Sequence, residues 1–406
     1  MTFNSGARVL ILVAISTPVF CQSRAPLPLL MDGHVHITGR VYWEGIDPWK
    51  PQPIGDWDYA RARESGVNVV IENIAPYGYN SYNTTVKQVG RLIETFHRVL
   101  EANPDKMELA LTSADVRRIV ANGKLAVILG IESGFDQEGD LDILRLWYRL
   151  GVRLIQFSSQ VTNSYADSSV RGEVKWNGIN DRGRRLIAEM NRLGIMIDIA
   201  HATDAAQRQI IEASRAPVVD SHVGMRAVCD NPANMPDDIL RALAAKGGLV
   251  GIHSYAAVIS QRYYDWTRAH AFSSGTYSSG RPDLTRAELP LVRSPNRDYG
   301  EYIAALDTEM GNLWRKWFGQ RWPEAPEAEP LVPTEDEWAA HVEHAVQVAG
   351  PANVAIGLDL SNGRSTLKSF DAQEYQRLIG SIRKRNLPDA VLGENWLRVM
   401  DAAKAP

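Results

Sequence analysis

Eight short apolar segments, separated by amphipathic stretches, follow one another between residues 28 and 361 of this chain. They read PLLMDGHVHI, GVNVVIENI, LAVILGIESG, GVRLIQFSS, GIMIDIAHAT, APVVDSHVG, GGLVGIHSY and NVAIGLDLS. Strands that are apolar almost throughout are buried on both faces, as in parallel sheets. Eight such strands alternating with helices predict an α/β fold, a (β/α)8 TIM-type barrel, with an open doubly wound sheet as the alternative.

The stretches between these segments have helical patterns. In DRGRRLIAEMNRLG, the apolar residues Leu186, Ile187, Met190 and Leu193 fall on one helical face. Because α/β barrels are commonly larger than an average domain, we expect residues 25–406 to form a single barrel domain. A long irregular segment, residues 256–333, follows the seventh strand and is rich in Tyr, Trp, Ser, Gly and Pro. We expect a partly helical lid there, with a solvated insertion as the alternative.

Residues 1–24 resemble a secretory signal peptide, with one arginine before an apolar core and a proline at position 18. The apolar core is shorter than the ~20 residues that cross a bilayer, and no later segment reaches that length. We therefore expect an exported protein, periplasmic or secreted, with no stable membrane span. Cys21 follows the bulky Phe20, which disfavours lipidation. Cys229 then has no partner, which excludes a disulfide framework.

The charge of the chain bears on its partners. A formal net charge of -4 and a pI near 6.2 provide no basic surface for nucleic acid or an anionic membrane. A small-molecule substrate is therefore expected. The oligomeric state stays open, a homodimer included.

Six side chains that can bind a metal lie at the carboxyl ends of the first, third, fifth, sixth and eighth apolar segments. They are His34, His36, Glu132, His201, His222 and Asp359. The carboxyl ends of parallel barrel strands meet at one rim. One strand-end histidine or acid is commonly a structural hydrogen-bonding group, but six together would each be costly to bury unpaired. The sequence therefore predicts a metal site at this rim.

The ligand types favour zinc, because they offer nitrogen and carboxylate oxygen without a thiolate. Four histidines and one glutamate exceed the three protein ligands of a single catalytic zinc, so we expect two Zn²⁺ per chain that share a carboxylate. Such a pair lowers the pKa of a bridging water, and the resulting hydroxide is a nucleophile near neutral pH. Hydrolysis is the expected chemistry.

Longer motifs in one order along the chain carry a family resemblance. They include DGHVH, GIESG, GVRLIQFSSQVTNSYADSS, GINDRGRRLIAEMNRLGIMIDIAHAT, APVVDSHVGMRAVCDNPANMPDD, HVEHAVQVAGPANVAIGLDLSNG and VLGENWLRV. The sequence resembles the renal (membrane) dipeptidase family of zinc metallopeptidases, within the amidohydrolase-like barrels. The resemblance implies that His34 and His36 hold one metal, that His201 and His222 hold the second, and that Glu132 bridges them.

The resemblance also implies catalytic residues and shows three departures. Asp359 would be the proton shuttle, and Glu132 would act with it as the metal bridge. The usual DGHND motif is DGHVH here, so His36 replaces an aspartate ligand. A histidine that faces the substrate carbonyl in the family falls at Ser159, and an arginine that pairs with the substrate carboxylate falls at Ala233. The chain is thus expected to be a divergent member.

Two candidates could compensate for the missing carboxylate clamp: His253, and Arg226 or Arg364. Ser159, at the position of the family histidine, is a further substrate-binding candidate. Packing in the core is the alternative for His253, and a solvated surface position is the alternative for the arginines.

The predicted activity is hydrolysis of dipeptides or a similar small amide. The alternatives are a hydrolase of a lactam, lactone or N-acyl amino acid, and a metal-binding homologue with little turnover. His341 and His344 share a face of a predicted helix, and we assign them to barrel packing.

Overall fold

A parallel β-sheet organises the computed structural model, which describes residues 28–53, 55–76, 82–132, 135–136, 138–158, 162–170, 173–269, 328–360, 367–368 and 370–404. In the described residues its strands are β1 (Met31–Val35), β2 (Val69–Ile74), β3 (Met107–Leu109), β4 (Leu125–Ile131), β5 (Val152–Gln156), β6 (Met196–Asp198), β7 (Val219–Val223), β8 (Leu249–Ile252) and β9 (Val354–Ile356). Eight of them pair in the order β1-β2-β4-β5-β6-β7-β8-β9, every pair parallel, and β3 pairs with β4 beside this path.

The two ends of this row of strands come together. Val35 forms a parallel bridge with Leu360, the amide of His36 donates to the carbonyl of Leu360 (3.1 Å), and the amide of Asp359 donates to that of His34 (2.9 Å). The sheet is therefore a nearly closed barrel of eight strands, which confirms the predicted fold class. Each predicted apolar segment contains one barrel strand. The three-residue β3 was not predicted, because so short a strand has no readable pattern.

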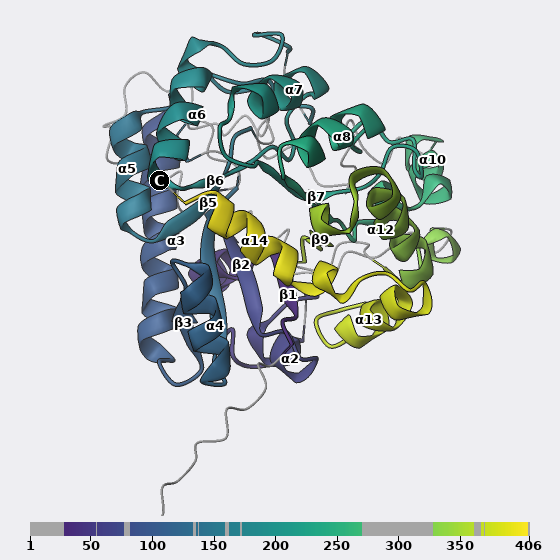
Figure 1. The fold of residues 1–406 in the computed structure, drawn as a ribbon. Coiled ribbons are helices and arrows are strands. Elements are labelled where there is room, and N and C mark those ends of the chain that lie inside the picture. Colours follow the sequence, from purple (N-terminus) through teal and green to yellow (C-terminus); the bar gives the residue numbers. More distant parts are fainter. Residues whose placement is uncertain are drawn as a thin grey trace, which may run out of the picture.

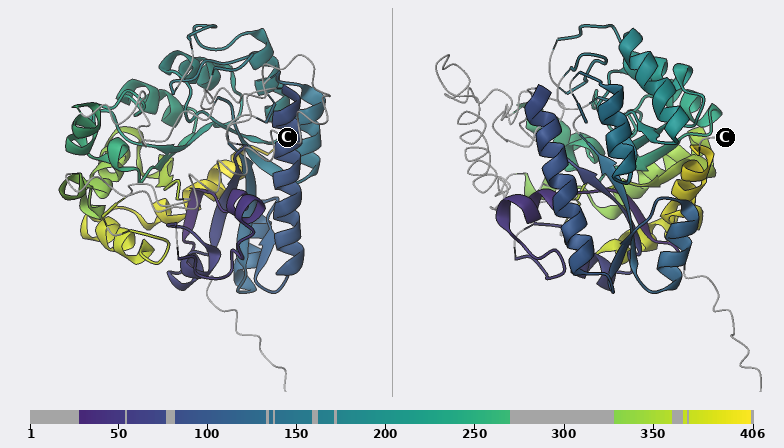
Figure 2. Two further views of the ribbon diagram at one scale, coloured as in Figure 1. Left: turned by 180° about the vertical axis from the view of Figure 1, so that it is seen from behind. Right: turned by 90° about the vertical axis from the view of Figure 1, so that its left-hand side faces the viewer.

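Helices surround the strands, as the views from the front, back and side show (Figures 1 and 2). They are α1 (Thr38–Glu44), α2 (Tyr59–Glu64), α3 (Tyr82–Ala102), α4 (Ser113–Ala121), α5 (Leu141–Arg149), α6 (Asp181–Leu193), α7 (Asp204–Ala213), α8 (Asp237–Ala245), α9 (Ala256–Ile259), α10 (Gln261–Ala269), α12 (Glu335–Ala349), α13 (Tyr375–Lys384) and α14 (Glu394–Ala402). The start of α6 is capped by the side chain of Asn180, and the helix ends at Gly194, whose φ of 78° favours glycine.

The inside of the barrel is apolar at one end. Residues such as Met31, Ile71 and Leu154 form a cluster there with Trp396 of α14, which crosses the strands in Figure 1. Gly33 permits this packing, because an added Cβ would lie 2.0 Å from the Trp396 ring. The Trp396 indole also donates to the carbonyl of Ile356 (3.0 Å). Side chains of α14 thus complete the apolar packing at this end of the barrel.

The predicted insertion begins after β8, the seventh barrel strand, with α9 and α10. Residues 270–327 lie outside the described part of the chain, as do residues 1–27, so the lid and the signal peptide stay predictions. Among the described residues, no helix is both long and apolar enough to cross a membrane.

Candidate metal centre

The six predicted ligand residues lie at one end of the barrel, and all are buried, with at most 7% of any residue exposed. His34 and His222 are on strands β1 and β7, and His36 and Glu132 follow the ends of β1 and β4. His201 and Asp359 each lie three residues beyond a strand end. The rim predicted from the sequence thus brings all six together.

His201 and Asp359 reach the centre through an uncommon backbone conformation. Their φ angles are +64° and +56°, in the left-handed region that non-glycine residues rarely adopt. Backbone hydrogen bonds hold both residues in this conformation. The amide of Ser169 donates to the carbonyl of His201 (2.8 Å), and the amide of Asp359 donates to the carbonyl of His34 (2.9 Å). Such backbone strain commonly occurs at functional sites.

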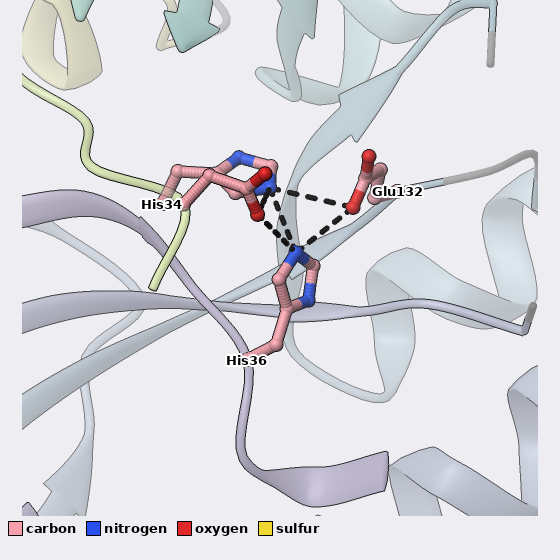
Figure 3. Close-up of side chains that lie close together, drawn as sticks. His34, His36 and Glu132 are labelled. Carbon is pink, nitrogen blue, oxygen red and sulfur yellow. Dashed lines mark hydrogen bonds and ion pairs between the residues drawn. The ribbon is translucent and has the colours of Figure 1, made fainter. Parts of the chain in front are cut away.

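One half of the centre contains His34, His36, Glu132 and Asp359. Figure 3 shows the His36 ring directed at both His34 and Glu132. The Nε2 atom of His36 lies 3.0 Å from His34 Nε2, 2.9 Å from Glu132 Oε2 and 3.2 Å from Asp359 Oδ1. Ligand atoms around a tetrahedral zinc are about 3.3 Å apart. The side chains therefore have the spacing of ligands that share one ion.

The other half contains Glu132, His201 and His222. His201 Nε2 lies 3.0 Å from Glu132 Oε1 and 3.0 Å from His222 Nε2. Glu132 thus directs Oε2 to one histidine pair and Oε1 to the other. This arrangement is that of a bridging carboxylate, and the two halves have the composition of a binuclear metal site.

The electrostatics of the buried cluster favour cations. Burial opposes a charge on His36, but hydrogen bonds to Asp359 and Glu132 outweigh it and raise the pKa of His36 to about 10. Burial also opposes a charge on Glu132, which for a carboxyl group would raise the pKa. Hydrogen bonds from His201, His34 and His36 nevertheless hold the pKa of Glu132 well below its usual value. Buried carboxylates here are stabilised by positive charge nearby, which divalent cations can supply.

Several buried polar residues inside the apolar segments support the ligands, and the sequence interpretation missed them. Asp32 accepts the amides of His34 and Leu358, both at 3.0 Å, and so joins β1 to the segment after β9. Ser221 contacts the rings of His34 and His222, and Asp198 contacts Ser221; both Ser221 and Asp198 are completely buried. A charged residue within an apolar segment is the signal that could have found Asp32 and Asp198.

The substrate-binding candidates are placed differently from one another. Ser159 and Arg364 lie outside the described residues. The guanidinium of Arg226 forms two hydrogen bonds with the carboxylate of Asp204 (2.8 and 2.9 Å) and donates to the carbonyls of Asn234 and Pro232 (both 2.8 Å). These contacts hold the loop on either side of Ala233. A role for Arg226 in substrate binding stays a prediction, and it requires these bonds to open.

His253 adjoins the metal-binding cluster. It is 1% exposed, and its Nε2 lies 3.6 Å from Asp359 Oδ2. Its Nδ1 lies 2.9 Å from the amide of Ser254 and 3.2 Å from the amide of Tyr255, and also 3.2 Å from the carbonyl oxygen of Leu358. The sequence proposed His253 as a substrate contact, and the structure places it beside the predicted proton shuttle.

His341 and His344 lie apart from the centre, on α12. His341 accepts the amide of Met225 (2.8 Å) and donates to the carbonyl of Ile259 (2.9 Å), while His344 contacts Asp237 (2.8 Å). Both take part in packing, as predicted.

Comparisons with known proteins identify relatives of this chain. Residues 27–405 match the family profile of membrane dipeptidase (peptidase family M19). Dipeptidase verJ of Clonostachys rogersoniana is 27% identical over 331 residues, which cover 80% of this chain and 66% of that protein. Dipeptidase 3 of Rattus norvegicus is 40% identical over 235 residues, 57% of this chain and 41% of that protein. The matched regions thus span less than two thirds of these relatives.

Solved structures agree on the fold. The probable dipeptidase PvdM from Pseudomonas aeruginosa superposes with a TM-score of 0.70 at 22% identity, covering 92% of this chain and 95% of that one. A metallopeptidase from Rhodobacter sphaeroides, liganded with a phosphinate mimic of the dipeptide L-Ala-D-Ala, gives 0.68 at 18% identity, covering 93% and 99%. Because the family profile matches nearly the whole barrel, the chain belongs to the membrane dipeptidase family, peptidase family M19.

Proposed function

We propose that this protein is a hydrolase with two zinc ions that cleaves dipeptides or a similar small amide. One observation carries the proposal: the buried carboxylate of Glu132 faces a histidine pair with each of its oxygens. Bridged metal pairs of this kind support hydrolysis. The dipeptidases among its relatives favour a small peptide as the substrate.

The residues present fit the two ions. His34, His36 and one oxygen of Glu132 would hold the first zinc, and His201, His222 and the other oxygen the second. Nitrogen and carboxylate donors without a thiolate favour zinc. His36 stands where the family motif has aspartate, and its imidazole remains a good zinc ligand.

When bound, the two ions would polarise the scissile carbonyl and lower the pKa of a water molecule to near neutrality. Asp359 lies 3.2 Å from the ligand atom of His36 and can accept the proton of the attacking water. It then returns this proton to the departing amine, as a general base and acid in turn. Nε2 of His253 lies 3.6 Å from the other oxygen of Asp359, so the His253 ring adjoins this carboxylate.

The loop around Ala233 supports a second candidate substrate class. Alanine cannot replace the bidentate grip of an arginine on a carboxylate. Arg226, the nearest candidate in the sequence, is engaged by Asp204. A hydrolase of a lactam, lactone or N-acyl amino acid is therefore the alternative, with a metal-binding homologue of little turnover as a third reading.

An assay of the purified chain from residue 25 onward, loaded with zinc, tests these proposals. Dipeptides with an L or a D residue at the C-terminal position are compared with a lactam, a lactone and N-acyl amino acids. Hydrolysis of dipeptides supports the first proposal, and hydrolysis of the other compounds alone supports the second. Two bound zinc ions without any turnover would favour the metal-binding homologue, and no bound metal would refute all three.

We also propose that the protein is exported, periplasmic or secreted. The apolar core within residues 1–24 supports this proposal. Cell fractionation with N-terminal sequencing of the product tests it, and a cytoplasmic protein that retains residue 1 would contradict it.

A further inference from the structure

We propose that Ser221 is a positioning residue that couples the two halves of the metal centre. Its hydroxyl would fix the ring of His34 in one half and the ring of His222 in the other. This inference rests on the metal site proposed above and adds a residue that acts on both metals at once.

The contacts of the Ser221 hydroxyl carry the proposal. Its Oγ lies 2.9 Å from Nδ1 of His34, 2.8 Å from Nδ1 of His222 and 2.5 Å from Oδ2 of Asp198. All four residues are completely buried, so water does not compete for these bonds. One hydroxyl therefore joins a candidate ligand of each metal to the same carboxylate.

The direction of the hydrogen bonds follows from what each group can donate. A hydroxyl has one hydrogen and two lone pairs, whereas an ionised carboxylate only accepts. When Asp198 is ionised, the hydrogen of Ser221 goes to Asp198, and both lone pairs of the hydroxyl accept the Nδ1–H of His34 and of His222. The hydrogen-bonding capacity of the hydroxyl is completely used by this arrangement.

Asp198 is itself held in place. Its Oδ1 accepts the amide of Ala200 (3.1 Å) and the amide of Ser221 (3.0 Å). The carboxylate therefore spans the carboxyl ends of β6 and β7 and has a fixed direction. A fixed acceptor fixes the hydroxyl rotor of Ser221, which in turn fixes the two rings.

The backbone of β7 is shaped to allow this. Adjacent residues of a regular strand point to opposite faces, yet the side chains of Ser221 and His222 contact one another. The pairing of β7 with β8 shifts register between Asp220 and Val223. Gly251 and Gly357 leave room for the carbonyl of Ser221, since an added Cβ would lie 2.1 or 1.8 Å from its oxygen.

The consequence concerns the ligand atoms. With Nδ1–H donated to Ser221, the lone pair on Nε2 of each ring faces the centre. There, Nε2 of His34 lies 3.0 Å from Nε2 of His36, and Nε2 of His222 lies 3.0 Å from Nε2 of His201. Outer partners of this kind set the tautomer and orientation of ligand histidines. Loss of the hydroxyl would release one ligand in each half at the same time.

Titration of the metal-stripped protein with Zn²⁺, in competition with a chelating dye, tests the proposal. Ser221→Ala removes the hydroxyl, and Ser221→Cys keeps a similar volume with a weak acceptor. Both variants should weaken both binding steps by about 10- to 100-fold, the usual effect of losing an outer partner. Ser214→Ala is the matched control: Ser214 is 2% exposed, lies before β7, and donates to the carbonyl of Ala216 (2.7 Å). It should leave both steps unchanged.

A second readout follows the rings directly. In zinc-loaded wild-type protein, the Nδ1–H protons of His34 and His222 should give hydrogen-bonded signals in ¹H–¹⁵N spectra, and both signals should shift in the variants. Should Ser221→Ala not fold, the cysteine variant decides. Wild-type affinity at either step in a folded variant, or equal weakening in Ser214→Ala, would overturn the proposal. Wild-type protein that binds no zinc would instead refute the proposed function.

Discussion

Asp359→Asn separates the two roles that the carboxylate of Asp359 could have, proton transfer and metal binding. The substitution keeps the size of the side chain and removes its ability to take up a proton. We expect turnover to fall by roughly 10²- to 10⁴-fold, the usual effect of losing a general acid or base, which corresponds to about 3 to 5 kcal/mol in activation free energy.

The geometry indicates that zinc should remain bound in this variant. The ligand atoms of His34, His36 and Glu132 lie 2.9 to 3.4 Å from one another, which is a complete set of three ligands. Asp359 Oδ1 is less central, at 3.2 Å from His36 Nε2 and 3.9 Å from His34 Nε2. Removing its charge should therefore leave two zinc ions per chain.

Elemental analysis and steady-state kinetics on the same preparations provide the measurement. Asp238→Asn is the control, because Asp238 is exposed on α8 and paired with Arg208; it should change neither value. If Asp359→Asn loses zinc in proportion to activity, Asp359 is a ligand and its assignment as proton shuttle is wrong.

Three further predictions concern the bridge, the substrate and the stability of the fold. Glu132→Gln should reduce zinc occupancy and abolish turnover, because a neutral amide bridges two cations poorly; no more than one tight metal in the wild type, by elemental analysis, would refute the binuclear site. Ala233→Arg should lower the KM for dipeptides by about 10- to 150-fold, since a charge-assisted contact contributes about 1.5 to 3 kcal/mol, and should not affect amidated or lactam substrates. Unchanged dipeptide kinetics in this variant and in Arg226→Ala would refute the idea that alanine at position 233 weakens binding of the substrate carboxylate. Burial lowers the pKa of His341 from 6.5 to about 4, so the unfolded chain binds a proton that the folded chain excludes. The free energy of unfolding should thus fall by up to about 3 kcal/mol from pH 6.5 to pH 4. His341→Gln should lose this part of the pH dependence in urea unfolding, and equal pH dependence in both proteins would contradict the assignment.

The gathering of the candidate ligands at one rim could be predicted because it follows from local patterns. Residues at positions i and i+2 of a strand share a face, which pairs His34 with His36. Parallel strands present their carboxyl ends on one rim, which gathers Glu132, His222 and the others. Neither step requires knowledge of a contact between distant segments.

The support behind the ligands could not be read in the same way. Ser221 contacts His34, although the two residues are 187 positions apart in the sequence. This contact depends on closure of the barrel and on the register shift of β7. Nor does local sequence indicate that His201 and Asp359 adopt positive φ, since the tertiary hydrogen bonds to their backbones hold that conformation.

Local sequence patterns were sufficient to predict the barrel, the rim at which the candidate ligands gather and the residue types that can bind a metal there, because hydrophobic periodicity and strand polarity are local properties. The tertiary structure decided which oxygen of Glu132 faces which histidine pair, that His253 lies beside Asp359, and that Arg226 is held by Asp204. These are distances between side chains from separate segments. They exist only once the sheet has closed and the loops have packed on its rim.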